Sequence, residues 1–156
     1  MTNTPSILIV DDDQYVRSML GRTLIVAGYR VREAKNGREA LTCCQSQPVD
    51  VVIMDIVMPE MEGLEAIRAI RRIKPEAKII AISGMSPRGP LGYLSIAERF
   101  GAARSFAKPL DQELLLATLR ELTSGFAAPV NDPGYPGLEE RGPVERPAAG
   151  WSSDGG

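Results

Sequence analysis

The sequence predicts an α/β fold in which helices cover both faces of a parallel β-sheet. Three short segments carry nearly continuous apolar side chains: Ser6–Val10, Val49–Met54 and Lys78–Ile82. Such runs are typical of strands that are buried on both sides. Segments with helical spacing lie between them, and this alternation produces right-handed crossovers and a parallel sheet. Ligands of such sheets bind outside the carboxyl ends of the strands.

Two weaker strands complete the predicted sheet. Tyr29–Glu33 alternates apolar and charged residues, as an edge strand does, whereas Ala103–Ala107 is short and mixed. We therefore expect five strands.

Five helices are expected to alternate with these strands. In the first, apolar or small side chains between Val16 and Ala27 recur at the spacing of one helical face, and Gly28 ends the helix. The others are Gly37–Ser46, Gly63–Lys74, Leu91–Phe100 and a last helix that Asp111 caps and that runs through Leu115, Leu119 and Leu122.

Length and composition indicate one globular domain in an ordinary soluble protein. The chain has 156 residues, of which 44% are hydrophobic and 24% charged, and its formal net charge is -2. Neither a nucleic-acid surface nor a membrane surface is expected from this balance. The N-terminus lacks the basic region and apolar stretch of a signal peptide, and every apolar run is shorter than the roughly 20 residues of a membrane helix. We therefore expect a cytoplasmic protein.

The chain changes character after about Ser124. Residues 125–156 contain prolines and glycines in abundance and no apolar periodicity. This composition is typical of a disordered tail. We therefore divide the chain into a domain at 1–124 and a tail at 125–156 that is too short for an output domain.

Residue usage narrows the possible chemistry. Histidine is absent, which excludes catalysis by imidazole, imidazole metal ligands and a phosphohistidine intermediate within this chain. Cys43 and Cys44 are adjacent and have no further cysteine to pair with, so they are interpreted as reduced thiols in or beside the core. Any metal must be bound mainly by oxygen.

Chemically versatile side chains follow four of the predicted strands. Asp11 and Asp12 follow the first strand, Asp55 the third, Ser83 the fourth and Lys108 the fifth. Parallel strands end at one edge, so we expect these residues to meet there. Asp55 is the most informative of these residues, because a carboxylate at the end of the most buried strand must be paired or bind a metal.

Clustered carboxylates predict a bound cation. Asp11, Asp12 and Asp55 would raise one another's pKa values unless a positive charge neutralised them. Oxygen ligands leave Mg²⁺, Mn²⁺ or Ca²⁺ as candidates, and few protein ligands beside room for phosphate favour Mg²⁺. A carboxylate beside Mg²⁺, faced by a lysine and a hydroxyl, is equipped for phosphoryl transfer onto aspartate.

These motifs together resemble the receiver domain of two-component response regulators. "ILIVDDD", "VDVVIMDIVMPEMEG", "AISG" and "FAKPL" occur in that family's order and near its spacings, from about Ser6 to Ser124. The resemblance implies a doubly wound, flavodoxin-like (CheY-like) fold with strand order 2-1-3-4-5. It also implies a cis peptide at Lys108-Pro109.

The resemblance also implies a role for each site residue. Asp55 would be the phosphoacceptor, Asp11, Asp12 and Asp55 would hold Mg²⁺ with the backbone carbonyl of Val57, and Ser83 and Lys108 would contact the phosphoryl group. A histidine kinase or a histidine phosphotransfer protein would be the donor. Receivers also often pair, so a homodimer is possible.

The sequence departs from the family pattern at three places. Ser105 stands where an aromatic switch residue is common, with Phe106 next to it, so the usual aromatic switch is not expected. Val57 and Met85 offer no polar group to orient an attacking water, which predicts a long-lived phosphoaspartate. The loop after Ser83 is long and rich in Gly and Pro; it is interpreted as either a neutral insertion or a recognition surface.

The expected function is that of a stand-alone receiver that signals by protein contacts and catalyses only its own phosphorylation and dephosphorylation. One alternative is a Mg²⁺-dependent phosphatase with an aspartyl nucleophile, but such enzymes generally need a second acid where Val57 stands. Another is a binding module that works without phosphorylation. Asp13 is expected to have a separate, structural role as the cap of the first helix.

Overall fold

The computed structural model describes residues 4–56, 62–84 and 96–125, and this part of the chain forms one five-stranded sheet. All neighbouring strands are parallel, in the order β2-β1-β3-β4-β5, so the predicted topology is confirmed. The strands are β1 Ser6–Val10, β2 Arg30–Ala34, β3 Val51–Asp55, β4 Lys78–Ser83 and β5 Arg104–Ala107.

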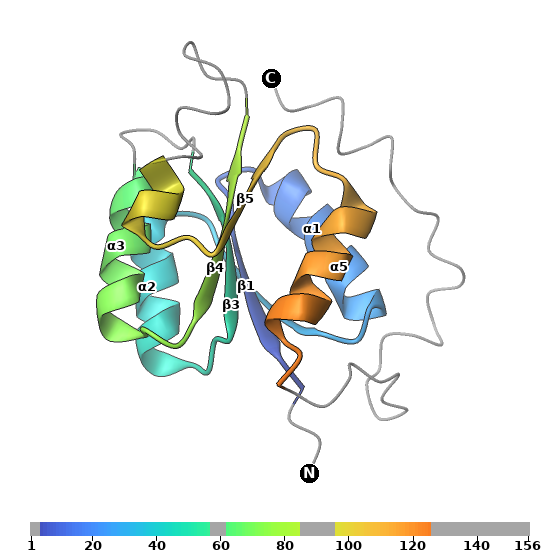
Figure 1. Cartoon of the computed structure of the whole chain (residues 1–156), viewed down its shortest axis with the longest axis horizontal. Helices are drawn as coiled ribbons and strands as arrows, with labels where there is room; N and C mark the ends of the chain where they lie inside the picture. The colour runs from blue at the N-terminus through green and yellow to red at the C-terminus, as the bar shows by residue number, and fades with distance from the viewer. Residues whose placement is uncertain (1–3, 57–61, 85–95, 126–156) are drawn as a thin grey trace.

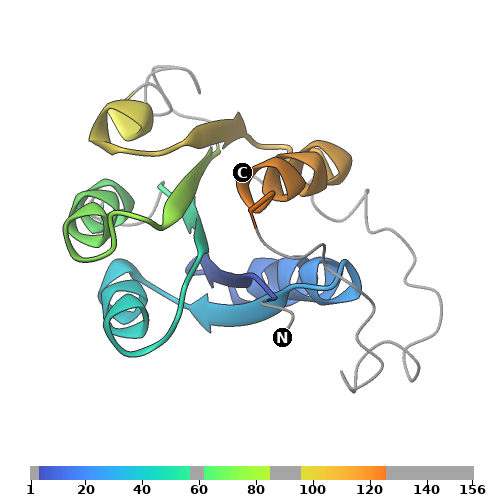
Figure 2. The same ribbon diagram turned by 60° about the horizontal axis from the view of Figure 1, so that its bottom comes forward.

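Helices cover both faces of this sheet. The helices are α1 Gln14–Val26, α2 Gly37–Ser46, α3 Glu62–Ile73 and α5 Gln112–Leu122, and residues 96–100 form a further helical segment. The views in Figure 1 and Figure 2 agree that α1 and α5 lie on one face. The helices α2 and α3 and the segment 96–100 lie on the other.

Strand alternation divides the core into two layers. Ile7 and Ile9 pack with residues of α1 and α5, whereas Leu8 and Val10 pack with residues of α2 and α3. Successive side chains of a strand point to opposite faces, so a strand that is covered on both sides must be apolar at every position. The whole of β1 is buried as a result, which confirms the interpretation of its continuous apolar run.

Helix ends follow the signals in the sequence. The Asp13 side chain accepts a hydrogen bond from the Tyr15 backbone N–H, and Asp111 caps α5 in the same way. Gly28, with φ of 99°, follows the last residues of α1 in the left-handed conformation that glycine adopts at little cost. The predicted caps and the predicted stop are confirmed.

Several predicted boundaries were wrong by one or two residues. β2 begins at Arg30 because the Tyr29 N–H bonds to the Leu24 carbonyl at 3.1 Å and closes the end of α1. β3 begins at Val51 and includes Asp55, β4 extends to Ser83, β5 begins at Arg104, and α3 covers Glu62–Ile73.

Some sequence-based expectations concern residues outside the described part of the chain. They are the Val57 carbonyl, Met85, the loop after Gly84, the first half of the predicted helix Leu91–Phe100, and the tail from residue 126 onward. Among the described residues, no helix is both long and apolar enough to cross a membrane.

Candidate functional site

Sheet register places Asp11 and Asp55 side by side. Ile9 pairs with Ile53 and Val10 with Met54, and Asp11 and Asp55 are the next residues along the two strands. Both carboxylates have the same strand phase as the isoleucines, so they point to the face covered by α1 and α5. Only 5% of Asp11 and 6% of Asp55 is exposed. Two acidic residues are therefore buried together where the central strands end.

Asp12 completes a cluster of carboxylates. Oxygen atoms of Asp11, Asp12 and Asp55, one from each side chain, all lie within 4.8 Å of one another. Asp12 is exposed, so the cluster opens to solvent on its side. The three residues that the sequence placed at one edge are thus brought together.

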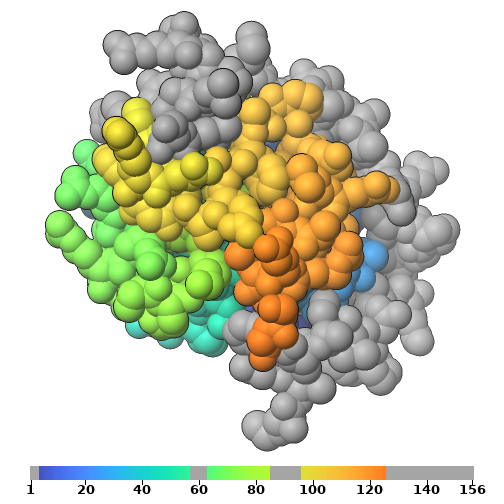
Figure 3. All heavy atoms as spheres, viewed as in Figure 1, coloured from blue at the N-terminus to red at the C-terminus, as the bar shows by residue number. Residues whose placement is uncertain are grey.

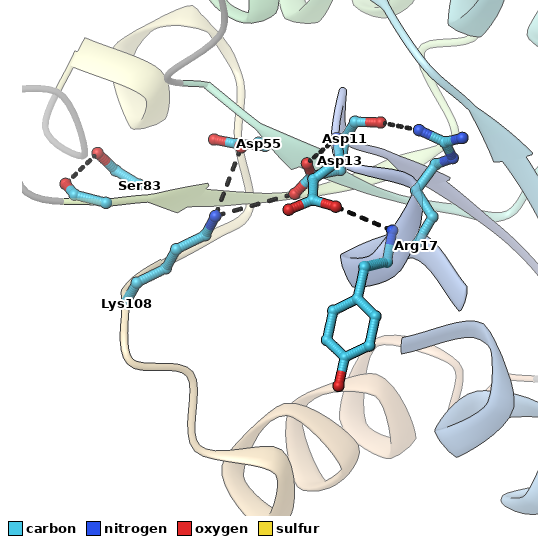
Figure 4. Close-up of polar contacts among 8 residues, drawn as sticks. Asp11, Asp13, Arg17, Asp55, Ser83 and Lys108 are labelled. Atoms are coloured by element: carbon cyan, nitrogen blue, oxygen red, sulfur yellow. Dashed lines mark hydrogen bonds and ion pairs between the residues drawn. The ribbon is translucent and has the colours of Figure 1, made fainter. Parts of the chain in front are cut away.

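Lys108 provides a cation next to this cluster. Its Nζ lies 3.5 Å from Asp55 Oδ2 and 3.9 Å from Asp11 Oδ2 (Figure 4). The Lys108 N–H donates to the Ser83 carbonyl at 2.8 Å, which ties the end of β5 to the end of β4. The Lys108-Pro109 peptide is cis, as the resemblance implied.

One lysine does not neutralise the cluster. The pKa of the Asp11 carboxyl is raised from 3.8 to about 7, mainly by burial and to a lesser extent by the neighbouring charges of Asp55 and Asp12. Hydrogen bonding from the Asp13 N–H and the charge of Lys108 act in the opposite direction. The net rise in this pKa shows that Lys108 does not offset the burial of Asp11 and the acidic groups beside it. A divalent cation would add positive charge here, and three carboxylate ligands fit a hard ion such as Mg²⁺.

Ser83 lies beside the cluster but points differently. It is fully buried, and its hydroxyl donates to the Gly84 carbonyl at 3.0 Å. Ser83 lies two residues after Ala81 on β4, so the two side chains point to the same face of the sheet. This face is covered by α2 and α3 and is opposite to the face of Asp55. Figure 4 shows the Ser83 side chain to one side of Asp55.

Gly63 is a contributor that the sequence patterns did not identify. A Cβ at this position would lie 2.7 Å from the Asp55 carbonyl oxygen and 2.7 Å from Ile56 Cα, closer than real Cβ atoms approach. The start of α3 therefore packs directly on the backbone that carries Asp55. The glycine in "EMEG" was the available signal, but only the packing shows what it does.

Arg17 is a second residue that the patterns did not single out. Its Nη1 donates to the Asp11 carbonyl oxygen at 2.6 Å, and its Nε lies 3.3 Å from Glu33 Oε1. The side chain, which is 14% exposed, therefore joins α1 and β2 to the turn that carries the carboxylates.

Ser105, at the position where the family resemblance leads us to expect an aromatic residue, makes a polar contact. Its hydroxyl donates to Glu98 Oε1 at 2.8 Å, whereas the neighbouring Phe106 packs against the core on the α1 and α5 face. Helical segment 96–100, β5 and α5 make up the face in yellow to orange in Figure 3. A serine–glutamate hydrogen bond thus links two of the elements of this face.

Comparisons with known proteins agree with this geometry. The family model of the response regulator receiver domain matches residues 7–120. The chain is 40% identical over 118 residues to the chemotaxis protein CheY of Thermotoga maritima, covering 75% of this chain and 96% of that protein. It is also 39% identical over 110 residues to the CAI-1 autoinducer sensor kinase/phosphatase CqsS of Vibrio cholerae, covering 70% of this chain and only 16% of that kinase.

A solved structure supports the same assignment. The chemotaxis protein CheY4 of Vibrio cholerae matches with a TM-score of 0.66 at 34% identity, covering 76% of this chain and 98% of that one. Both the sequence and the strand order therefore correspond to the CheY-like fold. The chain belongs to the response regulator receiver domain family of two-component signal transduction.

Proposed function

We propose that this receiver accepts a phosphoryl group on Asp55 from the phosphohistidine of a kinase or a phosphotransfer protein. The observation that carries the proposal is the cluster at the ends of β1, β3 and β5. There the Asp55 carboxylate lies 3.5 Å from the Lys108 ammonium and next to two further carboxylates. Receiver domains as a class interact with such donors, and this chain contains no histidine of its own.

The transfer needs little beyond positioning and charge neutralisation. An oxygen of the Asp55 carboxylate attacks phosphorus, and the bond from phosphorus to the donor's imidazole nitrogen breaks. Its electron pair stays on that nitrogen, which takes up a proton. Because the carboxylate is the nucleophile in its ionised form, no separate base is required. Lys108 is placed to pair with negative charge on the phosphoryl oxygens.

A Mg²⁺ ion is the proposed cofactor. Asp11, Asp12 and Asp55 would hold it, and the family resemblance adds the backbone carbonyl of Val57. When bound, the ion supplies positive charge that reduces repulsion between the carboxylates and the incoming phosphoryl oxygens. The chain's own contribution is to hold the three carboxylates close together.

Ser83 is the proposed sensor of the phosphoryl group. Its hydroxyl donates to the Gly84 carbonyl on the face of β4 opposite to Asp55, so contact with a phosphoryl oxygen requires movement of the end of β4 and loss of that hydrogen bond. The charged phosphoryl oxygen is a stronger acceptor than the carbonyl, which favours the moved form. The movement would report phosphorylation to the segment that follows β4.

Output by protein contacts is proposed for the domain. The chain covers 96% of the length of a CheY protein, in contrast to 16% of the sensor kinase CqsS. This coverage supports a receiver that acts by binding a partner. A pull-down with the phosphorylated protein, with Asp55→Asn as its control, would identify such partners.

A long-lived phosphoaspartate is a further part of the proposal. Val57 and Met85 are apolar and offer no side-chain group to orient an attacking water. We expect autodephosphorylation to be slower in the wild type than in Val57→Asn and Met85→Glu variants. Equal or faster decay in the wild type would contradict this part alone.

Phosphotransfer from a radiolabelled, histidine-phosphorylated donor domain tests the function directly. The label is expected to move to the wild-type chain and not to Asp55→Asn, because only the former offers a carboxylate at the end of β3. Multiple turnover of p-nitrophenyl phosphate in the presence of Mg²⁺ would instead favour an aspartyl phosphatase and would overturn the proposal.

A further inference from the structure

An arginine on α1 holds the backbone of the turn between β1 and α1. The Arg17 side chain starts from the first turn of α1, and its guanidinium reaches back to the Asp11 carbonyl at 2.6 Å (Figure 4). The same guanidinium lies 3.3 Å from Glu33 on β2. Three separate elements therefore meet at one planar group, whose donors have a fixed geometry.

The bonded carbonyl occupies a sensitive place in the turn. It belongs to the peptide that joins Asp11 to Asp12, so its orientation influences the direction in which both side chains leave the backbone. Two other hydrogen bonds hold the turn at Asp11. One runs from the Asp11 N–H to the Ala34 carbonyl at 3.2 Å, and one from the Asp13 N–H to Asp11 Oδ1 at 2.8 Å. Arg17 is thus the residue that holds the carbonyl side of this peptide.

We infer that Arg17, oriented by Glu33, is a positioning residue that holds Asp11 and Asp12 in the arrangement that binds a divalent cation. The inference rests on the proposed function, because it assigns a residue to the same metal site. Arg17 acts through the backbone. Its guanidinium donates to the Asp11 carbonyl and so orients the peptide that joins Asp11 to Asp12, and the carboxylates of these two residues bind the ion.

The sign of the expected effect separates this role from simple electrostatics. Arg17 carries a positive charge near the cluster, and a positive charge repels Mg²⁺. If charge alone mattered, Arg17→Met would bind Mg²⁺ more tightly than the wild type. A positioning role predicts weaker binding, since groups that orient metal ligands typically contribute about 10–100-fold to metal affinity.

Mg²⁺ titration by calorimetry tests the inference with wild type, Arg17→Met, Arg17→Lys and Arg22→Met. Arg22 is exposed on the same helix, so its replacement removes one charge without touching the turn. We expect about tenfold weaker binding in Arg17→Met. Arg17→Lys should lie in between because an ammonium can still donate to the carbonyl, and Arg22→Met should match the wild type. Binding by Arg17→Met as tight as the wild type, or tighter, overturns the inference.

A metal-free readout distinguishes positioning from general stability. In amide NMR spectra without Mg²⁺, Arg17→Met should shift the Asp12 and Asp13 signals and leave those of α5 unchanged. If that variant does not fold, Glu33→Ala replaces it, and unchanged Mg²⁺ affinity in Glu33→Ala then overturns the inference. A wild-type chain that binds no Mg²⁺ would refute the proposed cofactor itself, which is a different result from equal binding by wild type and variant.

Discussion

Replacement of Gly63 by alanine tests how tightly α3 is packed on the strand that carries Asp55. The new Cβ would lie 2.7 Å from the Asp55 carbonyl oxygen and 2.7 Å from Ile56 Cα. Both contacts are with backbone, so the methyl group cannot be accommodated by a side-chain rotation. Either α3 or the end of β3 must move by a few tenths of an ångström or more. Overpacking of this kind costs about 1–3 kcal/mol.

Gly21→Ala is the matched control, because a Cβ at Gly21 in α1 would have ordinary contacts of 3.6 Å with Val31 Cγ1 and 3.8 Å with Ile9 Cδ1. An alanine within a helix is favoured over glycine by about 0.5–1 kcal/mol, so this control should be at least as stable as the wild type. Urea unfolding measures both variants.

A loss of 2 kcal/mol in Gly63→Ala lowers the urea midpoint by about 1 M at an m-value of about 2 kcal/mol/M. Phosphorylation of Gly63→Ala should also be slower, because the displaced backbone carries the acceptor. A Gly63→Ala protein with the midpoint and the phosphorylation rate of the wild type would show that this packing argument is wrong.

Three further predictions concern the charged residues of the site. Asp12→Ala should abolish most Mg²⁺ binding, which calorimetry measures. Asp13→Ala should keep Mg²⁺ binding but lose about 1 kcal/mol of unfolding free energy, because the cap of α1 is removed. An equal loss of Mg²⁺ affinity in both variants would contradict the separate roles of Asp12 and Asp13. Lys108→Met should bind Mg²⁺ ~3-fold more tightly, because a competing cation is removed. The same variant should accept the phosphoryl group at least ~10-fold more slowly, because the ammonium no longer pairs with the phosphoryl oxygens. An unchanged transfer rate would refute this role of Lys108. The pKa of Asp11 is about 7 in the folded chain, against an ordinary value of 3.8 for an unfolded one. Proton binding by Asp11 therefore stabilises the metal-free fold at low pH, and this stabilisation is lost as the pH rises through 7. The thermal midpoint without metal should therefore decrease as the pH is raised from about 5 to 8, and it should decrease less in Asp11→Asn. The Mg²⁺ affinity of the wild type should increase over the same pH range, because the carboxyl loses its proton.

The positions of Asp11 and Asp55 could be predicted because local rules determine them. A buried parallel strand is apolar at every position, so the first charged residue marks the end of the strand. Strands of a parallel sheet all end at one edge. Strand phase then places the two carboxylates on the same face. No information about distant packing was needed.

Arg17 and Gly63 could not be predicted because their roles depend on contacts between elements. An arginine in the first turns of a helix is usually a solvated residue, and its bond to a carbonyl six residues earlier exists only once the turn has its final conformation. The Gly63 contact requires the distance between α3 and β3, which no pattern encodes. The start of β2 at Arg30 was missed for a similar reason, because the Tyr29 N–H bonds to the preceding helix and not to the sheet.

Phosphorylation by acetyl phosphate, followed by intact-mass spectrometry, is the decisive experiment for Asp55 as a Mg²⁺-dependent phosphoacceptor. The samples are the wild type with Mg²⁺, the wild type with chelator, and Asp55→Asn with Mg²⁺. We expect one phosphoryl group per chain in the first sample and little or none in the other two, if Asp55 is the acceptor and the cation neutralises the cluster around it. Equal labelling of Asp55→Asn, or equal rates with and without Mg²⁺, would refute the proposed function.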